Sequence, residues 1–257
     1  MARRFELICE VEPATRPDLT RVRRQIGVLS AITSRFLIPD NHIGRATVSS
    51  SAVAHEVGLM GGRATACLNA RDRNVLGFRR DLLTAAAYGV DEFLFVFGDR
   101  PESGRRSDDL NVRQMLDHAR RFDPSFRLGV STQLRSLPAW KQEADFLFVQ
   151  VSFSLERLLA WRSASSFDGP VYAGVMVVTS AAMARKLTSA IPQLAVPATV
   201  TAALERDPLA GVELACDLVH TIHDSGAFDG VHLIPVTRAR ETVRRLEQSP
   251  AFAHHEP

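Results

Sequence analysis

The sequence predicts an α/β fold, a (β/α)8 or TIM barrel formed by a single domain. The chain has 257 residues, a length that such barrels commonly occupy as one unit. Eight short apolar segments alternate with amphipathic helical segments. The connections between them are short, so neighbouring strands pair in parallel, and eight such units close most economically into a barrel.

Each expected strand is a short run rich in Phe, Leu, Val or Ile, as in strands buried on both faces. The fourth run ends abruptly on Gly98-Asp99 after a series of apolar residues. The expected strands are 5–10, 34–39, 63–68, 92–98, 126–131, 145–151, 170–176 and 228–233.

Helical patterns fill the intervals between these strands, and most of them begin with capping residues or first-turn acids. The expected helices are 17–31, 47–59, 74–89, 109–122, 153–164, 179–191, 207–225 and 239–247. The start signals are Pro17-Asp18, Ser49-Ser50, Asp108-Asp109, Ser152 to Ser154 and Thr179-Ser180. The connection 132–144 is too short for a loop and a full helix, so this unit is expected to be trimmed. The stretch 191–213 is long and proline-rich, which predicts an extra short helix.

A doubly wound open sheet is the competing architecture, because periodicity alone does not exclude it. The first strand of such a sheet is usually followed by a glycine-rich loop that holds phosphate groups. No such motif follows the first strand here, and Gly61-Gly62 precedes a strand instead of a helix. The barrel is therefore the favoured prediction, with residues 1–250 as the domain and 251–257 as a frayed C-terminal tail.

The composition is that of an ordinary globular protein. Hydrophobic residues make up 46% and charged residues 23%, and the net charge is +2. No basic stripe with interleaved aromatic residues occurs, so we expect no nucleic-acid partner. Three cysteines without a CxxC pair argue against a disulfide framework or a zinc site, so no metal is expected. The sequence shows no signal segment and no long apolar stretch, which predicts a cytoplasmic protein without a membrane partner.

Polar residues follow most of the expected strands, where catalytic groups of parallel α/β folds gather. Asp99 is one of them, and its position admits two interpretations. A carboxylate directly after a buried strand can face a ligand, or Gly98-Asp99 can simply form a turn. The polar residues at strand ends are Glu10, Glu12, Asp40, Asn41, Arg71 to Asn74, Asp99, Gln150, His232 and Arg238. Such a ring suits a polar, partly anionic ligand.

The order of these residues resembles methylenetetrahydrofolate reductases, and the resemblance extends over nearly the whole chain. It is nearest to the reductase module of proteins that fuse homocysteine methyltransferase and reductase. The motifs that carry it are Glu10-Val11-Glu12-Pro13, Asp40-Asn41 followed by Arg45, Arg71-Asp72-Arg73-Asn74, Gly98-Asp99, Asp145 to Gln150, Ala173-Gly174-Val175-Met176 and Gly230-Val231-His232 through Arg238.

The resemblance implies a (β/α)8 oxidoreductase of one-carbon metabolism that reduces 5,10-methylenetetrahydrofolate to 5-methyltetrahydrofolate. A buried carboxylic acid can supply the proton that opens the folate ring. Glu10 lies three residues before Pro13, as the family's general acid does before its proline, and Glu12 is the alternative. Strand periodicity places Glu10 and Glu12 on one face, so only the spacing from Pro13 chooses Glu10.

Further roles follow from the same resemblance. Asp99 matches the aspartate that contacts the pterin and stabilises cationic character during ring opening. Gln150 matches a glutamine that hydrogen-bonds the pterin, and Arg238 matches an arginine near the folate. A satisfied barrel amide and a solvated arginine are the respective alternatives.

The departures from the family lie on the flavin side. Cofactor contacts are expected at Asp40, Asn41, Cys67, Asp72, Phe97, Gly98 and Lys141. The family has a histidine where Cys67 stands, and Phe97 replaces a residue that hydrogen-bonds FAD. Only Lys141 of the trimmed segment 132–144 matches a flavin contact. Each polar contact to a cofactor contributes about 1 kcal/mol, so about four absent contacts would weaken FAD affinity by roughly a thousandfold or more.

Two interpretations of the enzyme therefore stay open. One is a flavoenzyme with a rebuilt FAD site. The other is a flavin-independent reductase in which NADH or NADPH, or another soluble hydride donor, occupies the same cleft. Beyond these, the chain could be a reductase of another pterin or C1 substrate, or a non-catalytic, regulatory folate-binding barrel. Retention of Glu10, Asp99 and Gln150 together argues against the non-catalytic role. A homo-oligomer is left open by the sequence.

Overall fold

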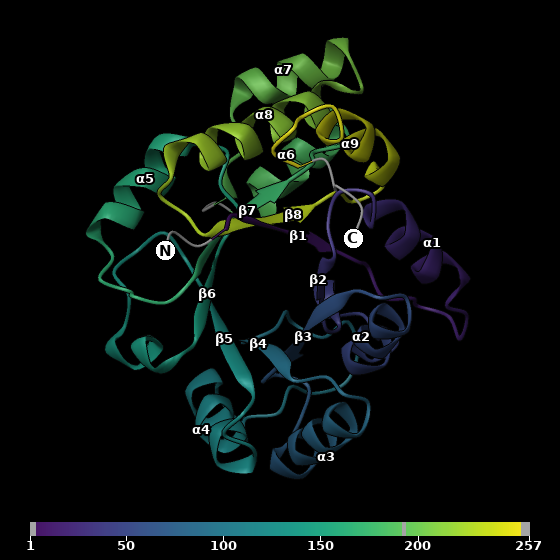
Figure 1. Ribbon diagram of the computed structural model, residues 1–257, viewed down its shortest axis with the longest axis vertical. Helices are drawn as coiled ribbons and strands as arrows, with labels where there is room; N and C mark the ends of the chain where they lie inside the picture. Colours follow the sequence, from purple (N-terminus) through teal and green to yellow (C-terminus); the bar gives the residue numbers. More distant parts are fainter. Residues whose placement is uncertain (1–3, 192–193, 253–257) are drawn as a thin grey trace.

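The strands form a ring that is surrounded by helices (Figure 1). The structure is a computed structural model that describes residues 4–191 and 194–252. Its eight described strands form a closed parallel barrel in sequence order, in which β1 pairs with both β2 and β8. This confirms the predicted (β/α)8 barrel. The strands are β1 (Glu6–Glu10), β2 (Arg35–Ile38), β3 (Arg63–Asn69), β4 (Glu92–Val96), β5 (Arg127–Thr132), β6 (Phe146–Val149), β7 (Val171–Met176) and β8 (Gly230–Ile234).

The helices between these strands lie close to the expected ranges. They are α1 (Thr20–Leu29), α2 (Ser50–Leu59), α3 (Val75–Ala87), α4 (Val112–Phe122), α5 (Leu155–Ala164), α6 (Ala181–Ala190), α7 (Ala198–Arg206), α8 (Ala210–Ser225) and α9 (Ala239–Leu246). Helix α7 is the extra short helix predicted within 191–213. The trimmed unit is also confirmed, because segment 132–144 contains only the 3-10 helix η2 (Ala139–Glu143). A second 3-10 helix, η1 (His42–Gly44), follows β2.

Several observed boundaries differ by about one to three residues from the expected ones, and two of these differences have a clear physical reason. Strand β4 ends at Val96, two residues before the predicted end, because Gly98 has φ +90° and turns the chain out of the barrel wall. Helix α4 does not start at Asp108-Asp109. Its cap is Asn111, whose side chain accepts a hydrogen bond from the Gln114 backbone N–H, while the Gln114 side chain accepts one from the Asn111 backbone N–H. This capping box satisfies two free backbone donors, which a pair of aspartates farther upstream cannot do.

The main core lies between strands and helices, and a second, smaller apolar cluster fills the barrel interior. The interior cluster includes Ile8, Leu37, Cys67, Leu94 and Phe148. Phe252 lies within the segment expected as a tail, yet it is buried against Phe5 and His223. The remainder of that tail, residues 253–257, lies outside the described residues.

A charged layer occupies the interior at the N-terminal ends of the strands. Glu92 accepts hydrogen bonds from Arg35 at 2.9 Å and from Arg127 at 2.7 Å, and from the hydroxyl of Thr65. Tyr172 donates to Glu6 in the same layer. Each buried charge therefore has a charged partner, as burial requires. The apolar cluster lies above this layer and separates it from the opposite end of the barrel.

Among the described residues, no helix combines the length and the apolar character needed to cross a membrane.

Candidate functional site

Glu10 and His232 form a close pair at the C-terminal mouth of the barrel. Glu10 is the last residue of β1, and its Oε2 lies 3.2 Å from Nε2 of His232 in β8. The Glu10 and His232 side chains are 17% and 10% exposed. The nitrogen is buried and makes no aligned hydrogen bond, although the carboxylate is this near. Phe148 packs edge-on against the imidazole, with the ring centroids 5.3 Å apart. An acid and a base that can share a proton thus lie in a half-closed, partly apolar setting.

Cys67 lies beneath this pair, within the apolar interior cluster. Burial raises the pKa of its thiol well above the usual value, and the Glu10 and Asp40 carboxylates raise it further. The thiol therefore stays protonated near neutral pH. The same electrostatic influence indicates that Glu10 and Asp40 both lie near Cys67.

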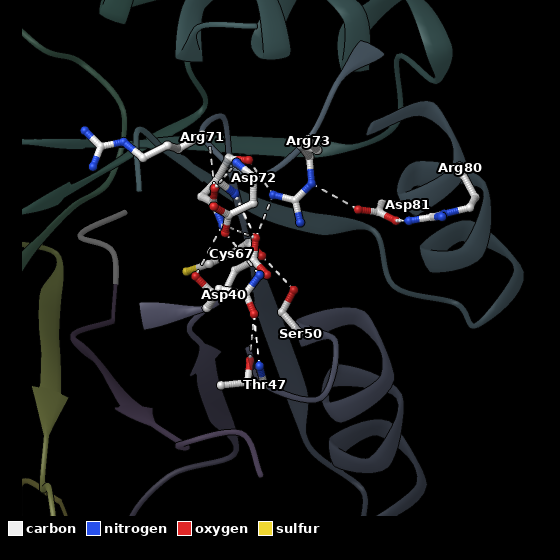
Figure 2. A network of polar contacts seen from close by, with 11 residues as sticks. Asp40, Thr47, Ser50, Cys67, Arg71, Asp72, Arg73, Arg80 and Asp81 are labelled. Carbon is white, nitrogen blue, oxygen red and sulfur yellow. Dashed lines mark hydrogen bonds and ion pairs between the residues drawn. The ribbon is translucent and has the colours of Figure 1, made fainter. Parts of the chain in front are cut away.

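Asp40 is the centre of a buried polar network at the ends of β2 and β3 (Figure 2). Its Oδ2 accepts hydrogen bonds from the Asn69 backbone N–H at 2.9 Å, the Asn69 side chain at 2.8 Å and Arg73 Nη1 at 2.7 Å. Arg73 also donates to Asp81 of α3 at 3.0 Å. Burial lowers the pKa of Arg73, but the two carboxylates outweigh this effect and hold it above its ordinary value. The Asp40 charge is thereby compensated inside the protein.

The Arg-Asp-Arg-Asn motif continues this network. Asp72 accepts hydrogen bonds from Asn69 Nδ2 at 2.8 Å and Asn41 Nδ2 at 3.1 Å. Asn74 caps α3 by accepting from the Gly77 N–H at 2.8 Å. The structure thus brings the predicted cofactor residues Asp40, Asn41 and Asp72 together, and there they contact one another and Asn69.

The Gly98-Asp99 turn holds the loop that follows β2. Asp99 is exposed, and its Oδ2 accepts a hydrogen bond from the Ile43 N–H at 2.7 Å. A Cβ at Gly98 would lie 2.9 Å from the Asn69 side chain, so glycine allows the ends of β3 and β4 to meet. Phe97 is 51% exposed, and the Arg71 guanidinium lies 4.5 Å above its ring. Asp99 thus contacts a distant loop instead of capping a local turn, and its contact with a pterin stays a prediction.

Glu12 and Glu10, which the strand pattern did not distinguish, occupy different environments. Glu12 lies beyond β1, its side chain is 41% exposed, and Arg21 is 3.7 Å away. It lines a cleft of about 400 Å³ beside α1, together with Pro13 and Arg16. Glu10 is half-buried in the mouth with His232 at 3.2 Å, whereas the more exposed Glu12 lies 4.0 Å from His42. This difference favours Glu10 as the acid.

The other predicted residues lie on the rim with partners of their own. Gln150 is exposed and accepts from the Val151 N–H at 3.2 Å. Arg238 donates to Glu241 at 2.9 Å. Lys141 Nζ donates to the Ser131 carbonyl at 2.6 Å, and burial together with nearby Arg135 lowers the pKa of Lys141 to about 8.

Two residues of the site were not assigned roles from sequence. His232 was recognised only as a strand-end polar residue, and Asn69 was not singled out. Parallel register would have indicated the first, because Ile8 pairs with His232 and Glu10 shares the face of Ile8. Asn69 was missed because the partner that makes it part of the network, Asp40, is 29 residues away in the sequence, although Arg71 and Asp72 are its near neighbours. Within the described part of the chain, no group of three or more His, Cys, Asp or Glu could hold a metal ion.

Residues 137–250 match the family model described as methylenetetrahydrofolate reductase. This match confirms the resemblance predicted from the strand-end motifs for that part of the chain. No curated protein matches the sequence.

The fold is similar to several solved structures. An uncharacterized protein from Clostridium thermocellum that binds two copies of 5-methyl-5,6,7,8-tetrahydrofolic acid has a TM-score of 0.70 and 11% identity, over 95% of this chain and 94% of that one. The Bacillus cereus spore cortex-lytic enzyme SleL has a TM-score of 0.57 and 10% identity, over 95% and 75%. Tryptophan synthase from M. tuberculosis reaches 0.52 and 16%, over 95% and 90%. At these identities the likeness shows the fold alone.

Proposed function

We propose that this chain, whose residues 137–250 match the methylenetetrahydrofolate reductase family model, binds a reduced folate at the barrel mouth. We propose further that it reduces 5,10-methylenetetrahydrofolate to 5-methyltetrahydrofolate. The Glu10–His232 pair is the observation that carries the proposal, because it supplies a proton donor in a half-buried setting. The C. thermocellum barrel that binds 5-methyltetrahydrofolic acid supports the ligand class.

The first step is a proton transfer. Glu10 in its acid form donates a proton to a folate nitrogen, and the bond from that nitrogen to the bridging methylene carbon breaks. The product is an iminium whose methylene carbon accepts hydride from a reduced nicotinamide, which becomes oxidised. His232 positions the Glu10 carboxyl through its 3.2 Å contact. A carboxylate at Asp99 would stabilise the cationic iminium if water is excluded.

The residues expected to bind FAD do not fit that cofactor well. Asp40 and Asp72 accept hydrogen bonds from neighbouring side chains, Phe97 carries the Arg71 guanidinium, and Lys141 donates to a backbone carbonyl. Asp40, Asp72 and Lys141 would each have to give up an existing contact to bind flavin. We therefore propose direct hydride transfer from NADH or NADPH, with FAD-dependent transfer as the alternative outcome of the test.

The test starts with the purified protein and its visible spectrum. A colourless protein that oxidises NADH or NADPH only when methylenetetrahydrofolate is present supports direct transfer. A flavin spectrum with turnover supports the FAD alternative. Folate binding without turnover favours a non-catalytic folate-binding barrel.

Glu10→Gln tests the acid within this scheme. It keeps the shape of the side chain and removes the proton, so we expect turnover to fall by at least about a hundredfold while folate affinity changes little. Glu12→Gln, two residues beyond the end of β1, is the matched control and should retain most activity. If the two variants turn over equally, Glu10 is not the acid.

A further inference from the structure

Arg71 differs from the half-buried arginines Arg35 and Arg73 of the barrel. Arg35 and Arg73 contact carboxylates of Glu92 and Asp40 at 2.9 and 2.7 Å. No carboxylate of the described residues forms an ion pair with Arg71, and its Nε is buried without a hydrogen-bond partner. A partly desolvated cation without a counter-charge is costly, so its retention requires a partner.

The backbone of Arg71 is fixed on both sides. Its N–H donates to Asn69 Oδ1 at 3.0 Å, and its carbonyl accepts from the Ser107 N–H at 2.7 Å. The side chain points away from the Asp40–Arg73 network (Figure 2). The position of the guanidinium is thus set by the same Asn69 that organises the network, while its donors are left without an acidic partner.

Phe97 supports the guanidinium from one side. The charged carbon lies 4.5 Å from the ring centroid, within the range of a cation–π contact. Arginine stacked on an aromatic ring keeps its planar fork of donors available for a carboxylate or phosphate. Half of the Phe97 surface is exposed and can contact a planar group of the same ligand.

We propose that Arg71 and Phe97 form an oxyanion-binding subsite at the rim of the mouth, on the β3–β4 side. Its ligand is the anionic end of a molecule that reaches into the barrel: a phosphate of the nicotinamide nucleotide or a carboxylate of the glutamate tail of folate. The two share the chemistry of a doubly accepting oxyanion. The assignment of these two sources rests on the proposed function, whereas the anion subsite itself rests on Arg71.

Isothermal titration calorimetry with two small probes tests the subsite without turnover. Pyrophosphate represents the nucleotide, and p-aminobenzoyl-glutamate represents the folate tail. Arg71→Met should weaken binding of one of the two probes by roughly 10- to 100-fold, the loss expected for a charge-assisted hydrogen bond. Arg71→Lys retains the charge without the planar fork of donors, so its affinity for the responding probe should lie between those of the unsubstituted protein and Arg71→Met. The probe that responds identifies the source of the anion.

Arg79→Met on the exposed surface of α3 is the control for the same change in net charge. It should bind both probes as the unsubstituted protein does. Thermal unfolding of each variant checks that the fold is kept. Equal binding to the protein and to Arg71→Met, or no binding of either probe to the unsubstituted protein, would overturn the subsite. Absence of turnover with intact, Arg71-dependent probe binding would count against the proposed reaction alone.

Discussion

Asp40→Asn distinguishes a structural carboxylate from one that awaits a cofactor. The Asp40 side chain is 5% exposed, and that of its partner Arg73 is 11% exposed. The substitution keeps the size of the side chain but removes the charge opposite Arg73. Removing one partner of a buried ion pair costs about 3–5 kcal/mol. Arg73 retains Asp81 at 3.0 Å, so the lower end, about 3 kcal/mol, is expected.

The expected change in melting temperature follows from the size of the chain. At about 2.1 cal/mol/K for each of the 257 residues, the unfolding entropy is about 0.54 kcal/mol/K. A loss of about 3 kcal/mol therefore lowers Tm by about 6 °C. Circular dichroism during heating measures this shift at fixed pH and salt.

A double-mutant cycle assigns the loss to the ion pair. Combining Asp40→Asn with Arg73→Met should cost clearly less than the sum of the single substitutions, because the first change already removes the interaction that the second would break. Additive losses, or an Asp40→Asn variant whose Tm stays within about 1 °C of the parent, would refute the structural interpretation. In that case Asp40 would be free to serve a ligand.

Two further predictions concern the rim. The pKa of Lys141 is lowered to about 8, so its positive charge is present below about pH 8 and lost above it. If Lys141 binds the phosphate of NADPH, the affinity for NADPH, measured from about pH 6.5 to 9.5, should fall as the pH rises through about 8. Lys141→Arg should remove this fall. Gly98→Ala adds a Cβ 2.9 Å from the Asn69 side chain at φ +90°, whereas Gly104→Ala adds a Cβ in open space at φ +82°. Thermal unfolding should therefore show a loss of stability that is larger for Gly98→Ala by about 1 kcal/mol or more. Equal losses would mean that the contact with Asn69 is not tight.

The order of the strands and helices was predictable because each buried parallel strand is a short apolar run that needs no knowledge of its neighbours. The residues at which strands and helices end were less predictable. Phe97 is apolar and extends the β4 pattern, yet the left-handed Gly98 beside it ends the strand and leaves the ring half exposed. The sequence predicts that helix α4 starts at Asp108-Asp109, although Asn111 and Gln114 form the capping box of that helix.

The candidate site was predictable where the local sequence places a residue at the end of a strand, and not where the residue's partner comes from a distant part of the chain. Glu10 was placed correctly at the mouth because it ends β1. Its partner His232 depends on the β1–β8 register, which closes the barrel across most of the chain length. Likewise, the rim acids follow their strands as expected, but the contact of Asn69 with Asp40 joins two strand ends that are 29 residues apart and was not predictable from the local pattern.

In the proposed reaction, the acid Glu10 and the residues expected to contact a cofactor lie at the ends of different strands, and this separation would allow proton transfer without flavin contacts. Glu10 is held by β1 and contacts β8, whereas Asp40, Asp72 and Phe97 lie at the ends of β2, β3 and β4. The interactions among the rim residues do not include the Glu10–His232 contact. Cofactor contacts could therefore be exchanged for internal hydrogen bonds without moving the acid. On this basis we expect substitutions at the rim to act mainly on KM for the hydride donor, and Glu10→Gln to act mainly on kcat.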